Sequence, residues 1–566
     1  MNRRSQFIPV GLIFALLAGF FVLPPARGAK AQTTPQDAPV QDQAAAPVGE
    51  QDQGLTDALR MQIESLVQEK ESRTKAQAKL DSQLIYAIKM ERGEAITDAV
   101  PTLEVSVKVD DSGRTLVDIR ADVTPQVLSA IKAAGGTVVN SFPNDKAIRA
   151  SLPLSSLEAI AGLADVKFIR PADEAITEKV DPNGKNAVSD EIVAPAARPG
   201  PAAAPAPVNP TLLRGLRPGF ADRAANVRAK LTALVAGAAA QQNDPAPEIG
   251  AVTAESDTTE RTREARNFYG LNGKGMKIGI LSDSFNFRGE YANDIATGDL
   301  PGPGNPYGYT TPVTIVPGQD SGSSDEGRAM AQIIHDIVPG AQLFFATANG
   351  GEANFANNIR ILRNTYGCDV ITDDVNYTLE SPLHKSEEVS RAVDDVVAAG
   401  AMYFASAGNA GNLNDGTSGV WEGNFVDAGA NTGGIVTVVA GGTFHDFDPG
   451  AGVATQNPIN RTITTARPAT LFWSDPQGAS TNDYDLYLIS GTLDTNGAGR
   501  VVAASTTIQN GTQDPVESVS VPGSANGAPG GRRLAVFKKT AAAVRFIHVN
   551  LNRSRFDPVN GANIPA

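Results

Sequence analysis

The chain has 566 residues, a formal net charge of −14, four histidines and a single cysteine, Cys368. This length is more than one hydrophobic core supports, so several domains are expected. The acidic charge argues against nucleic acid or an anionic membrane surface as a partner, and a single cysteine excludes a disulfide within the chain.

Residues 1–31 are expected to be a secretory signal. Asn2-Arg3-Arg4 is basic, the stretch from Ile8 to Leu23 is largely apolar, and Ala29-Lys30-Ala31 fits a small-x-small cleavage site. A membrane anchor is the alternative, but it needs roughly 20 apolar residues and prolines bracket a shorter run here. We therefore expect a secreted protein, extracellular or periplasmic, with no membrane contact after signal removal.

Two segments precede the first expected domain. Residues 32–54 contain almost no apolar side chains, which predicts a disordered tether. Residues 55–95 form a helical segment, because Gly and Pro are absent from Leu55 to Met90 and apolar residues recur at helical spacing. The pattern fits one long amphipathic helix or two. Its apolar positions are Leu59, Ile63, Leu66, Val67, Leu80, Leu84 and Ile88.

Residues 96–177 are expected to form a small α+β domain. A hairpin is predicted from residues 103–110 and 115–122, which alternate apolar and polar around Asp111-Ser112-Gly113. The remaining predicted elements are helices at 125–134 and 154–163 and strands at 137–141, 147–152 and 166–169. Residues 178–255 are rich in Pro and Ala and predict a linker, with one helix at 221–241.

Residues 256–452 are expected to form an α/β domain with a doubly wound, mainly parallel sheet. Short apolar strands alternate with helices, and such alternation predicts parallel strands joined by helical crossovers. The strands are expected at 276–282, 342–346, 369–372, 401–405 and 435–440, and the helices at 325–338, 354–366 and 385–399. Gly367 and Gly400 stand where helices should end.

Residues 453–552 are expected to form an antiparallel β-sandwich, followed by a tail at 553–566. Short strands of period two are separated by Gly, Asn and Pro turns, without a helix signal. Asp475, Asp483 and Asp485 could hold Ca²⁺, but carboxylates beside turns are also ordinary surface residues. No cofactor is predicted, and calcium stays an unsupported possibility.

Three polar residues are expected at one edge of the α/β sheet. Asp283 follows the strand at 276–282, Glu326 opens the next helix, and Asn409 follows the strand at 401–405. Parallel α/β sheets react at the carboxyl ends of their strands, where the following helices also begin. An acid, a base and an amide donor at that edge outline an acyl-transfer site.

Glu326 heads an apolar stripe on its helix. A structural alternative for this carboxylate is a capping box with Ser323, since an acid in a first turn is favoured by the helix dipole. His335 falls on the side opposite Glu326 and is expected to pack or cap, not to act as a base. The expected stripe contains Ala329, Met330, Ile333, Ile334, Ile337 and Val338.

These motifs resemble the clan of serine peptidases that holds the subtilases and the sedolisins. The similar segments are Ile278-Gly279-Ile280-Leu281 before Asp283, Gly327-Arg328-Ala329-Met330-Ala331 in a helix ending at Val338-Pro339-Gly340-Ala341, and Ala407-Gly408-Asn409. Glu326 stands where subtilases carry His and sedolisins use Glu. The sedolisin supporting Asp lies one turn on, where this chain has Met330, and sedolisins place Asp where Asn409 stands.

The resemblance implies that Asp283 orients the base, Glu326 is the base and Asn409 stabilises the oxyanion. Residues 96–177 likewise resemble a subtilase propeptide in pattern and position, with an unrelated small domain as the alternative. The implied partners are a polypeptide substrate and this propeptide-like domain.

The nucleophile of the clan is missing from the sequence. Its Ser stands in a Gly-Thr-Ser-x-x-x-Pro segment, which does not occur after Asn409, and Gly416-Thr417-Ser418 lacks the Pro. The resemblance therefore implies a secreted serine-type endopeptidase whose chain is truncated before the catalytic Ser and is inactive as written. The alternatives are a non-catalytic secreted peptide-binding protein and an adhesion module in which the sandwich is the working part.

Overall fold

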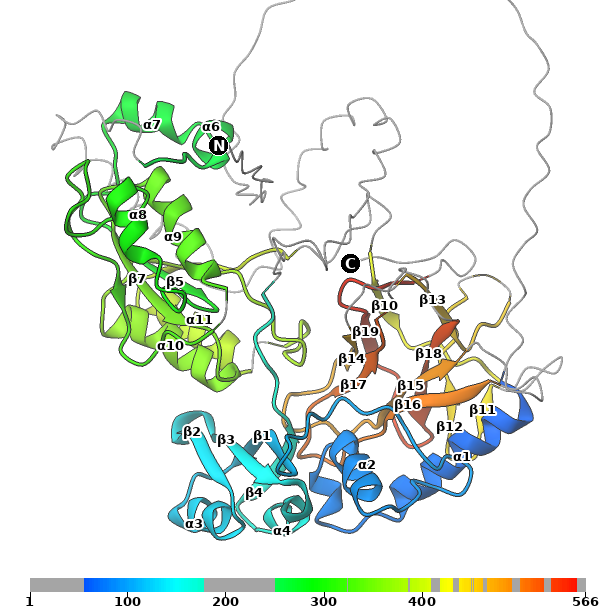
Figure 1. Cartoon of the computed structure of the whole chain (residues 1–566). Coiled ribbons are helices and arrows are strands. Elements are labelled where there is room, and N and C mark those ends of the chain that lie inside the picture. The colour runs from blue at the N-terminus through cyan, green and yellow to red at the C-terminus, as the bar shows by residue number, and fades with distance from the viewer. Residues whose placement is uncertain are drawn as a thin grey trace, which may run out of the picture.

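The computed structural model describes residues 55–177, 250–322, 324–384, 387–408, 418–430, 437–448, 450, 452–461, 466–490, 499–523 and 531–556. The expected signal, the tether, the helix at 221–241 and Asn409 lie outside the described residues. Figure 1 shows a small α+β unit in cyan, an α/β unit in green and a β-sandwich in yellow to red, with the N-terminal helices in blue against the sandwich.

The N-terminal segment forms two helices. Helix α1 spans Asp57–Glu71 and α2 spans Ser82–Glu91, with the 3-10 helix η1 at Gln77–Lys79 between them. Every apolar position expected to face a core in this segment is buried. The Thr56 side chain caps α1 by accepting a hydrogen bond from the Leu59 N–H. The predicted amphipathic pattern is therefore confirmed. Of the two alternatives, one long helix or two helices, the structure shows two helices.

The α+β unit contains a four-stranded antiparallel sheet of order β2-β3-β1-β4. Its buried face carries apolar residues from alternate positions of β1, which pack against the helices. The strands are β1 Arg114–Ala121, β2 Thr137–Phe142, β3 Ala147–Pro153 and β4 Val166–Pro171. The helices are α3 Pro125–Ala133 and α4 Leu157–Ala161, with 3-10 helices η2 Pro143–Asp145 and η3 Leu154–Ser156.

The predicted hairpin in this unit is confirmed only at its turn, where the Asp110 N–H donates to the Arg114 carbonyl at 2.8 Å. Residues 103–110 do not form a strand beside β1, although Val109 makes an isolated bridge to Thr115. The Glu104 N–H instead donates to the Val502 carbonyl of the sandwich at 2.7 Å. An alternating extended segment can be satisfied by a distant strand as well as by its neighbour, and the local pattern does not tell the two apart.

The α/β unit has a five-stranded sheet of order β6-β7-β5-β8-β9 in which all neighbouring strands are parallel. The strands are β5 Lys277–Ser282, β6 Thr314–Ile315, β7 Gln342–Thr347, β8 Val370–Asp373 and β9 Met402–Phe404. The helices are α6 Glu255–Thr259, α7 Thr262–Tyr269, α8 Tyr291–Thr297, α9 Glu326–Ile337, α10 Glu352–Asn364 and α11 Glu388–Ala398. Strand β6 and helices α6, α7 and α8 were not predicted.

Helices cover both faces of this parallel sheet. Met330 and Ala331 of α9 share one apolar cluster with Ile280 of β5, whereas α10 and α11 share another with Leu281. Because Ile280 and Leu281 are successive residues of one strand, their side chains point to opposite faces. The doubly wound α/β architecture expected from the sequence is therefore present.

The C-terminal part is a sandwich of two antiparallel sheets. One has the order β10-β19-β14-β17, and the other the order β11-β12-β18-β13-β20, with β15 paired to β18 and β16 paired to β15. One apolar cluster draws residues from both sheets, including Trp473 and Val536. The strands are β10 Val420–Asn424, β11 Val438–Val439, β12 Gly442–Phe444, β13 Asn457–Arg461, β14 Arg467–Trp473, β15 Tyr484–Ser490, β16 Arg500–Ser505, β17 Val516–Val521, β18 Arg532–Lys539, β19 Phe546–Asn550 and β20 Arg555–Phe556.

The sandwich begins earlier in the chain than expected. The strand predicted at 435–440 for the parallel sheet contributes β11, which pairs antiparallel with β12 in the sandwich. Strand β10 pairs antiparallel with β19. The range 256–452 expected for the α/β domain thus includes three sandwich strands, because short apolar strands carry no local mark of the sheet they join.

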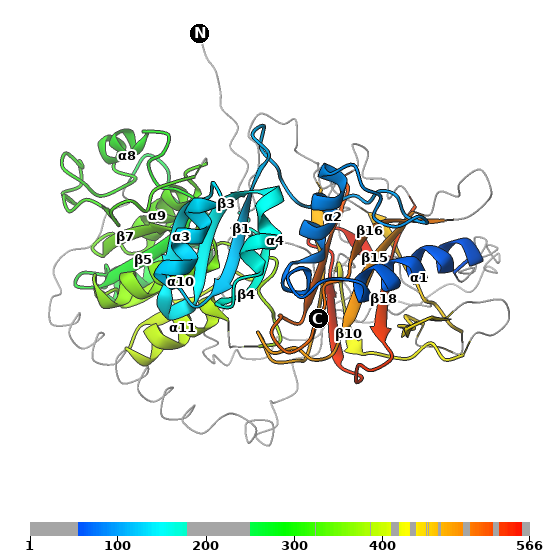
Figure 2. The same ribbon diagram turned by 90° about the horizontal axis from the view of Figure 1, so that it is seen from below.

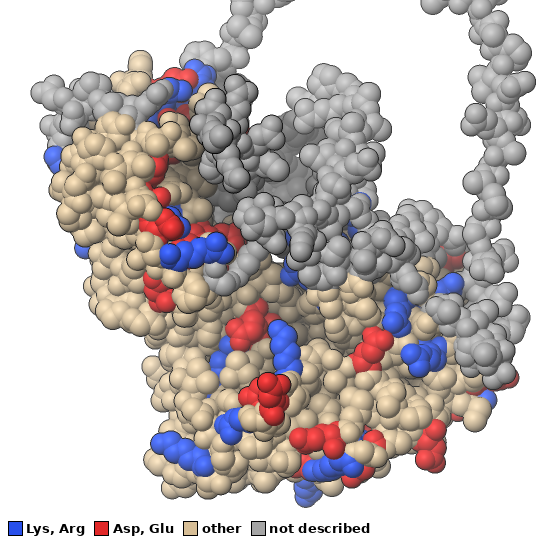
Figure 3. Space-filling view, in the orientation of Figure 1, with Lys and Arg blue, Asp and Glu red and all other residues tan. Residues whose placement is uncertain are grey.

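Charged side chains of both signs are interspersed on the face of the molecule drawn in Figure 3. None of the helices in the described part of the chain has both the length and the apolar composition of a membrane span.

Candidate active site

Asp283 is the first residue after β5, and its carboxylate holds the start of α9. One oxygen, Oδ1, accepts the backbone N–H of Glu326 at 3.0 Å, and the other accepts the N–H of Ser324 at 2.9 Å. The residue that precedes the helix, Asp325, has a left-handed backbone with φ of 58° and makes no side-chain cap. Asp283 therefore satisfies a helix N–H that a local cap would otherwise bind.

The pKa of Asp283 is lower than that of an ordinary aspartate. Burial raises this pKa, but hydrogen bonds from the Ser324 hydroxyl and from the N–H groups of Ser324, Ser284 and Glu326 outweigh burial. Asp283 is 2% exposed, so the charge is held by donors of the protein and not by bulk water. A fixed negative charge therefore lies at the positive end of α9.

Glu326 is the first residue of α9 and is half-buried. A capping box requires the acidic residue at the third helical position, with the N-cap residue just before the helix. Here the N-cap is Asp325, so Glu326 stands at the first helical position. The structural alternative of a Ser323–Glu326 capping box is therefore wrong, and Ser323 itself lies outside the described residues.

A third carboxyl group, Asp374, lies beside these two and was missed by the sequence analysis. Leu281 of β5 pairs in register with Asp373 of β8, so the next residues, Ser282 and Asp374, leave the sheet at the same edge. Burial, followed by the negative charge of Glu326, raises the pKa of Asp374 to about 8. Its Oδ1 is buried and has no hydrogen-bond partner among the described residues. The sequence contained a signal for this group, because Asp373 and Asp374 directly follow the strand predicted at 369–372, as Asp283 follows the strand predicted at 276–282.

Asn409 cannot be placed, because it lies outside the described residues. The strand that leads to it, β9, is the parallel neighbour of β8 and ends at the same edge. Tyr403 of β9 donates its hydroxyl to Asp373 of β8 at 2.6 Å, which ties the two strand ends together. The predicted position of Asn409 at this edge therefore stays a prediction.

Ser418 belongs to the Gly416-Thr417-Ser418 segment that lacks the proline of the clan's nucleophile motif. It lies just before the sandwich strand β10. Its hydroxyl accepts the backbone N–H of Val420 at 3.2 Å. It thus acts in a turn before an antiparallel strand, as its lack of the family proline suggested.

The buried side of α9 differs from the predicted apolar stripe. Ala329 is exposed, and Ile333 and Ile337 are only half-buried. A Cβ on Gly327 would come within 2.3 Å of the Phe345 ring, so glycine lets this helix lie close to β7. The helix is turned accordingly, and its buried residues are Gly327, Met330, Ala331, His335 and Asp336.

His335 is fully buried within the α/β unit. Its ring stands edge-on to Tyr309 with centroids 5.3 Å apart, and neither ring nitrogen has a hydrogen-bond partner among the described residues. Burial lowers the pKa of His335 to about 4. These contacts agree with a packing role.

The chain that leaves the α+β unit reaches the same edge of the α/β sheet. After β4, residues 172–177 run beside the segment that follows β8. The Ile176 N–H donates to the Asn376 carbonyl at 2.8 Å, and the Asn376 N–H donates back at 3.0 Å. Asp173 accepts the Leu379 N–H at 2.9 Å. We call residues 172–177 the tail; one isolated antiparallel bridge, between Ile176 and Asn376, joins it to the chain two residues beyond Asp374.

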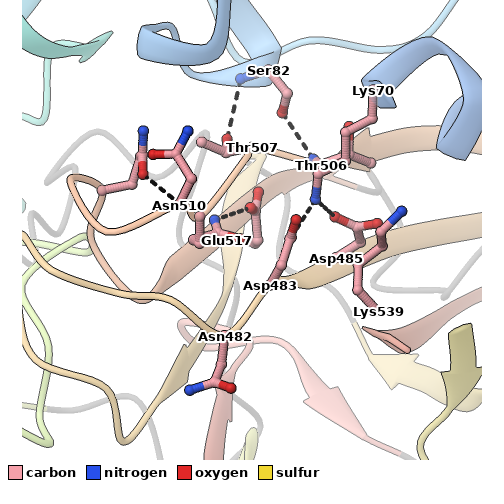
Figure 4. Close-up of polar contacts among 12 residues, drawn as sticks. Lys70, Ser82, Asn482, Asp483, Asp485, Thr506, Thr507, Asn510, Glu517 and Lys539 are labelled. Carbon is pink, nitrogen blue, oxygen red and sulfur yellow. Dashed lines mark hydrogen bonds and ion pairs between the residues drawn. The ribbon is translucent and has the colours of Figure 1, made fainter. Parts of the chain in front are cut away.

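The three aspartates considered for calcium bind protein groups. Asp483 and Asp485 both contact the Lys70 ammonium from α1, at 2.6 Å in the case of Asp485 (Figure 4). Asp475 instead binds the Arg545 guanidinium at 2.6 Å and the Asn482 side chain. No His, Cys, Asp and Glu cluster of metal-binding geometry occurs among the residues that the structure describes.

Comparison with known proteins gives structural similarities of low degree. The sequence matches no protein-family model and no curated protein. A variant of the epidermin leader peptide processing serine protease from Staphylococcus aureus matches with a TM-score of 0.28 and 12% identity, over 54% of this chain and 63% of that chain. The CspB protease of Clostridium perfringens matches with a TM-score of 0.30 and 12% identity, over 54% and 68%.

Fervidolysin from Fervidobacterium pennivorans, a keratinolytic enzyme related to subtilisin, matches with a TM-score of 0.23 and 15% identity. The match covers 61% of this chain and half of fervidolysin, 50%. These proteins are proteases, but at such scores the matches carry no conclusion about this chain. The functional argument therefore rests on the geometry above.

Proposed function

We propose that this chain is a secreted member of the subtilase and sedolisin clan, built for binding and hydrolysis of peptides, with Glu326 as general base. Asp283 would orient the base through the start of α9, and Asn409 would stabilise the oxyanion. The nucleophilic Ser that the reaction needs is not found after Asn409, so the chain as written is proposed to be inactive.

The tail carries this proposal. Its Ile176 exchanges two backbone hydrogen bonds with Asn376, at the sheet edge where Asp283, Glu326 and Asp374 lie. Binding through the backbone of an added strand is a general way for a protein to hold a peptide, since it does not depend on the peptide's side chains. In this proposal the tail occupies the place of a substrate, and residues 96–177 act as a propeptide-like domain.

Peptide binding after replacement of the tail tests the proposed peptide site beside residues 376–379. In a full-length variant with residues 172–177 replaced by Gly and Ser, a fluorescent peptide with the sequence of residues 171–177 should bind, whereas the unaltered chain should bind it far more weakly. The matched control is the same peptide with Pro at the position of Ile176, which lacks the N–H that donates to Asn376. Equal binding of both peptides, or binding of neither, would contradict this peptide site.

A non-catalytic peptide-binding protein is the second candidate, favoured by the missing Ser segment. The two candidates differ once the chain is supplied with the Gly-Thr-Ser-x-x-x-Pro segment of the clan, because only the peptidase should then react with a fluorophosphonate probe and cleave unfolded casein. The chain as written is expected to give neither labelling nor turnover. Labelling at one defined Ser would show that the nucleophile is present after all.

A further inference from the structure

Lys70 of α1 is a buried amine that lies between two carboxylates of the sandwich, Asp483 and Asp485 (Figure 4). We propose that the Lys70 Nζ condenses with the carboxyl group of Asp485 to form an amide bond between the two side chains. This bond joins α1 to β15 across 415 positions of the sequence. It does not rest on the proposed function, because it uses no residue of the α/β sheet edge.

Lys70 stands where an amphipathic helix ordinarily carries an apolar residue. It follows Leu66 by four positions and Val67 by three, so these side chains share the face of α1 that packs on the sandwich. Figure 2 shows α1, in blue, alongside the sandwich strands. The Lys70 side chain is 2% exposed, and lysine is almost never buried to this extent without a partner. The fold thus directs a nucleophile into the interface.

Asp485 receives this amine from the sandwich side. It belongs to β15, whose residues are all buried, and its own side chain is fully buried. Its Oδ1 lies 2.6 Å from the Lys70 Nζ, and the carboxyl carbon Cγ is one bond further. Reacting atoms in a productive geometry lie about 3–3.5 Å apart. The amine is therefore placed for attack on the carboxyl carbon.

Burial favours the neutral product over the ion pair. Removing an ammonium and a carboxylate from water costs free energy that their attraction repays only in part. Condensation replaces both charges by one neutral amide and releases a water molecule. Because both groups belong to one folded chain, their effective concentration is that of aligned intramolecular reactants, which reaches about 10⁵–10⁸ M.

The ion pair of Lys70 is the starting state of the reaction. Burial lowers the pKa of its ammonium group, but the charges of Asp483, Asp485 and Glu517 outweigh burial and raise it. The amine therefore becomes neutral when a proton passes to a carboxylate that contacts it. Transfer to Oδ1 of Asp485 gives the neutral amine and the neutral acid that condensation requires.

Two neighbouring side chains serve the remaining steps. When Nζ attacks Cγ, negative charge develops on Oδ2 of Asp485, to which the Tyr487 hydroxyl donates at 3.2 Å. Asp483 also contacts Nζ, so it accepts a proton from the nitrogen and passes it to Oδ1. The bond between Cγ and Oδ1 then breaks, and Oδ1 leaves as water.

The atoms and charges balance without a co-reactant. Of the three hydrogens on the ammonium, one stays on the amide nitrogen and two leave with Oδ1 as water. Asp483 ends ionised, as it began, and nothing is oxidised or reduced. The Asp483 side chain is 18% exposed, which gives the released water a path to solvent.

Mass spectrometry of the full-length protein tests the bond. The intact mass, corrected for the N-terminus that is found, should be lower than the sequence mass by one water. Trypsin does not cleave after an acylated lysine, so it should release residues 61–73 joined to residues 462–500. The second peptide spans Arg467 because a proline follows it. Fragmentation of the joined peptide should place the link at Asp485.

Three results of this measurement would overturn the proposal. The first is recovery of residues 61–70 as a free peptide without the joined peptide. The second is a link at Asp483 in place of Asp485. The third is a loss of water confined to one linear peptide, because this indicates cyclisation of a single side chain onto its own backbone.

A matched pair of lysine variants separates the amide from an ordinary ion pair. Lys70→Arg keeps the positive charge, but a guanidinium is always protonated and forms no amide, so the loss of water should disappear from a chain that circular dichroism shows to be folded. Lys539→Arg alters a lysine that pairs with the exposed Glu71 and should keep the loss. Loss of water in both variants, or in neither, would contradict the assignment.

The rate of bond formation tests the two neighbouring side chains. The joined peptide is measured at intervals after a pulse of isotope-labelled synthesis. Asp483→Asn should slow its appearance by about 10²-fold, the lower end of the range for general acid–base catalysis, and Tyr487→Phe should slow it as well. An unchanged rate in Asp483→Asn would overturn its role as the proton carrier. Failure of the peptide-binding test would leave all these results unchanged.

Discussion

The carboxylate of Asp283 accepts the backbone N–H of Glu326 at 3.0 Å. The residue that follows β5 thus fixes the residue that opens α9. This contact sets the position of the Glu326 backbone at the sheet edge, and it is made by a group whose pKa is lowered by its hydrogen bonds. Asp283 is therefore expected to stay ionised and to position α9 over the whole neutral range.

Asp283→Asn should loosen the start of α9. An amide keeps one acceptor oxygen where the carboxylate offers two, and hydrogen bonds to a charged group contribute about 1.5–3 kcal/mol each. Hydrogen exchange in the peptide around residues 320–330 should accelerate roughly tenfold at pH 7, as that free energy implies. Asp111→Asn, at an exposed turn, is the control. Unchanged exchange in the Asp283 variant would mean that its hydrogen bonds do not hold the helix start.

The lowered pKa of Asp283 also predicts how its contribution to stability changes with pH. Because the pKa of Asp283 is lower in the folded protein, its stabilising contribution is present above the pKa of an unfolded aspartate, about 3.9, and is lost as the pH falls below that value. The difference in exchange between the unaltered chain and Asp283→Asn should therefore shrink in acid. A difference that grew in acid would contradict this sign.

Asp374 predicts the opposite pH dependence. Its pKa is raised to about 8, so its contribution to stability is fully present below about pH 4 and is lost as the pH rises through 8. Asp374→Asn cannot ionise and should lose less stability between pH 6 and pH 9 than the unaltered chain. Thermal unfolding of the two chains across this pH range, followed by circular dichroism, compares their stabilities.

Glu326 provides a control for Asp374. The negative charge of Glu326 is the second cause of the raised pKa, after burial. Glu326→Gln should therefore reduce the alkaline loss of stability but not abolish it. If Glu326→Gln left that loss unchanged, the two carboxyl groups would not interact as the structure indicates.

His335 should destabilise the α/β unit in mild acid. Its pKa is lowered to about 4, whereas an unfolded histidine has a pKa near 6.5, so the unfolded state binds more protons between these values. Relative to His335→Leu, which lacks this group, the unaltered chain should lose stability as the pH decreases from 6.5 to 4. Gln332→Leu, at a half-buried position of the same helix, should keep this loss.

The sequence predicted the elements of the α/β unit because their signals are local. Gly367 and Gly400 have positive φ of 75° and 95° and follow α10 and α11, as expected for glycines that end helices. Strand β6 spans only Thr314–Ile315, which is too short for a period to appear. The orientation of α9 was missed because close packing of Gly327 on Phe345 decided it, against the hydrophobic pattern.

Other features were not predicted from the sequence because they depend on contacts between distant segments. Lys70 meets Asp483 and Asp485 across more than four hundred residues, separated by 413 and 415 positions. Nothing in the neighbourhood of either aspartate marks a lysine partner, so the pair was first considered for calcium. The position of Asp374 could have been predicted from the sequence, because the ends of parallel strands share one edge of a sheet. Its interaction with the charge of Glu326 could be found only from the structure.

Substitutions of Glu326 test its proposed role as base most directly. They require a chain supplied with the Gly-Thr-Ser-x-x-x-Pro segment of the clan, because a base without a nucleophile cannot open the covalent route. In that chain Glu326→Gln should abolish peptide hydrolysis, since an amide does not accept the proton of the Ser hydroxyl at neutral pH. Loss of at least a thousandfold in kcat/KM is expected from the contribution of a general base, about 10²–10⁴-fold, together with the loss of nucleophile activation.

Glu326→His distinguishes a base from a residue that merely positions the helix. A base must be deprotonated to act, and a glutamate ordinarily ionises about two pH units below a histidine. If Glu326→His retains activity, the acid limb of its pH profile should therefore lie at higher pH than that of the Glu326 chain. Asp283 holds the backbone N–H of residue 326 and not its side chain in this contact, so both substitutions leave that hydrogen bond available. Full activity in Glu326→Gln, with unchanged exchange at the start of α9, would show that Glu326 opens its helix without acting in catalysis.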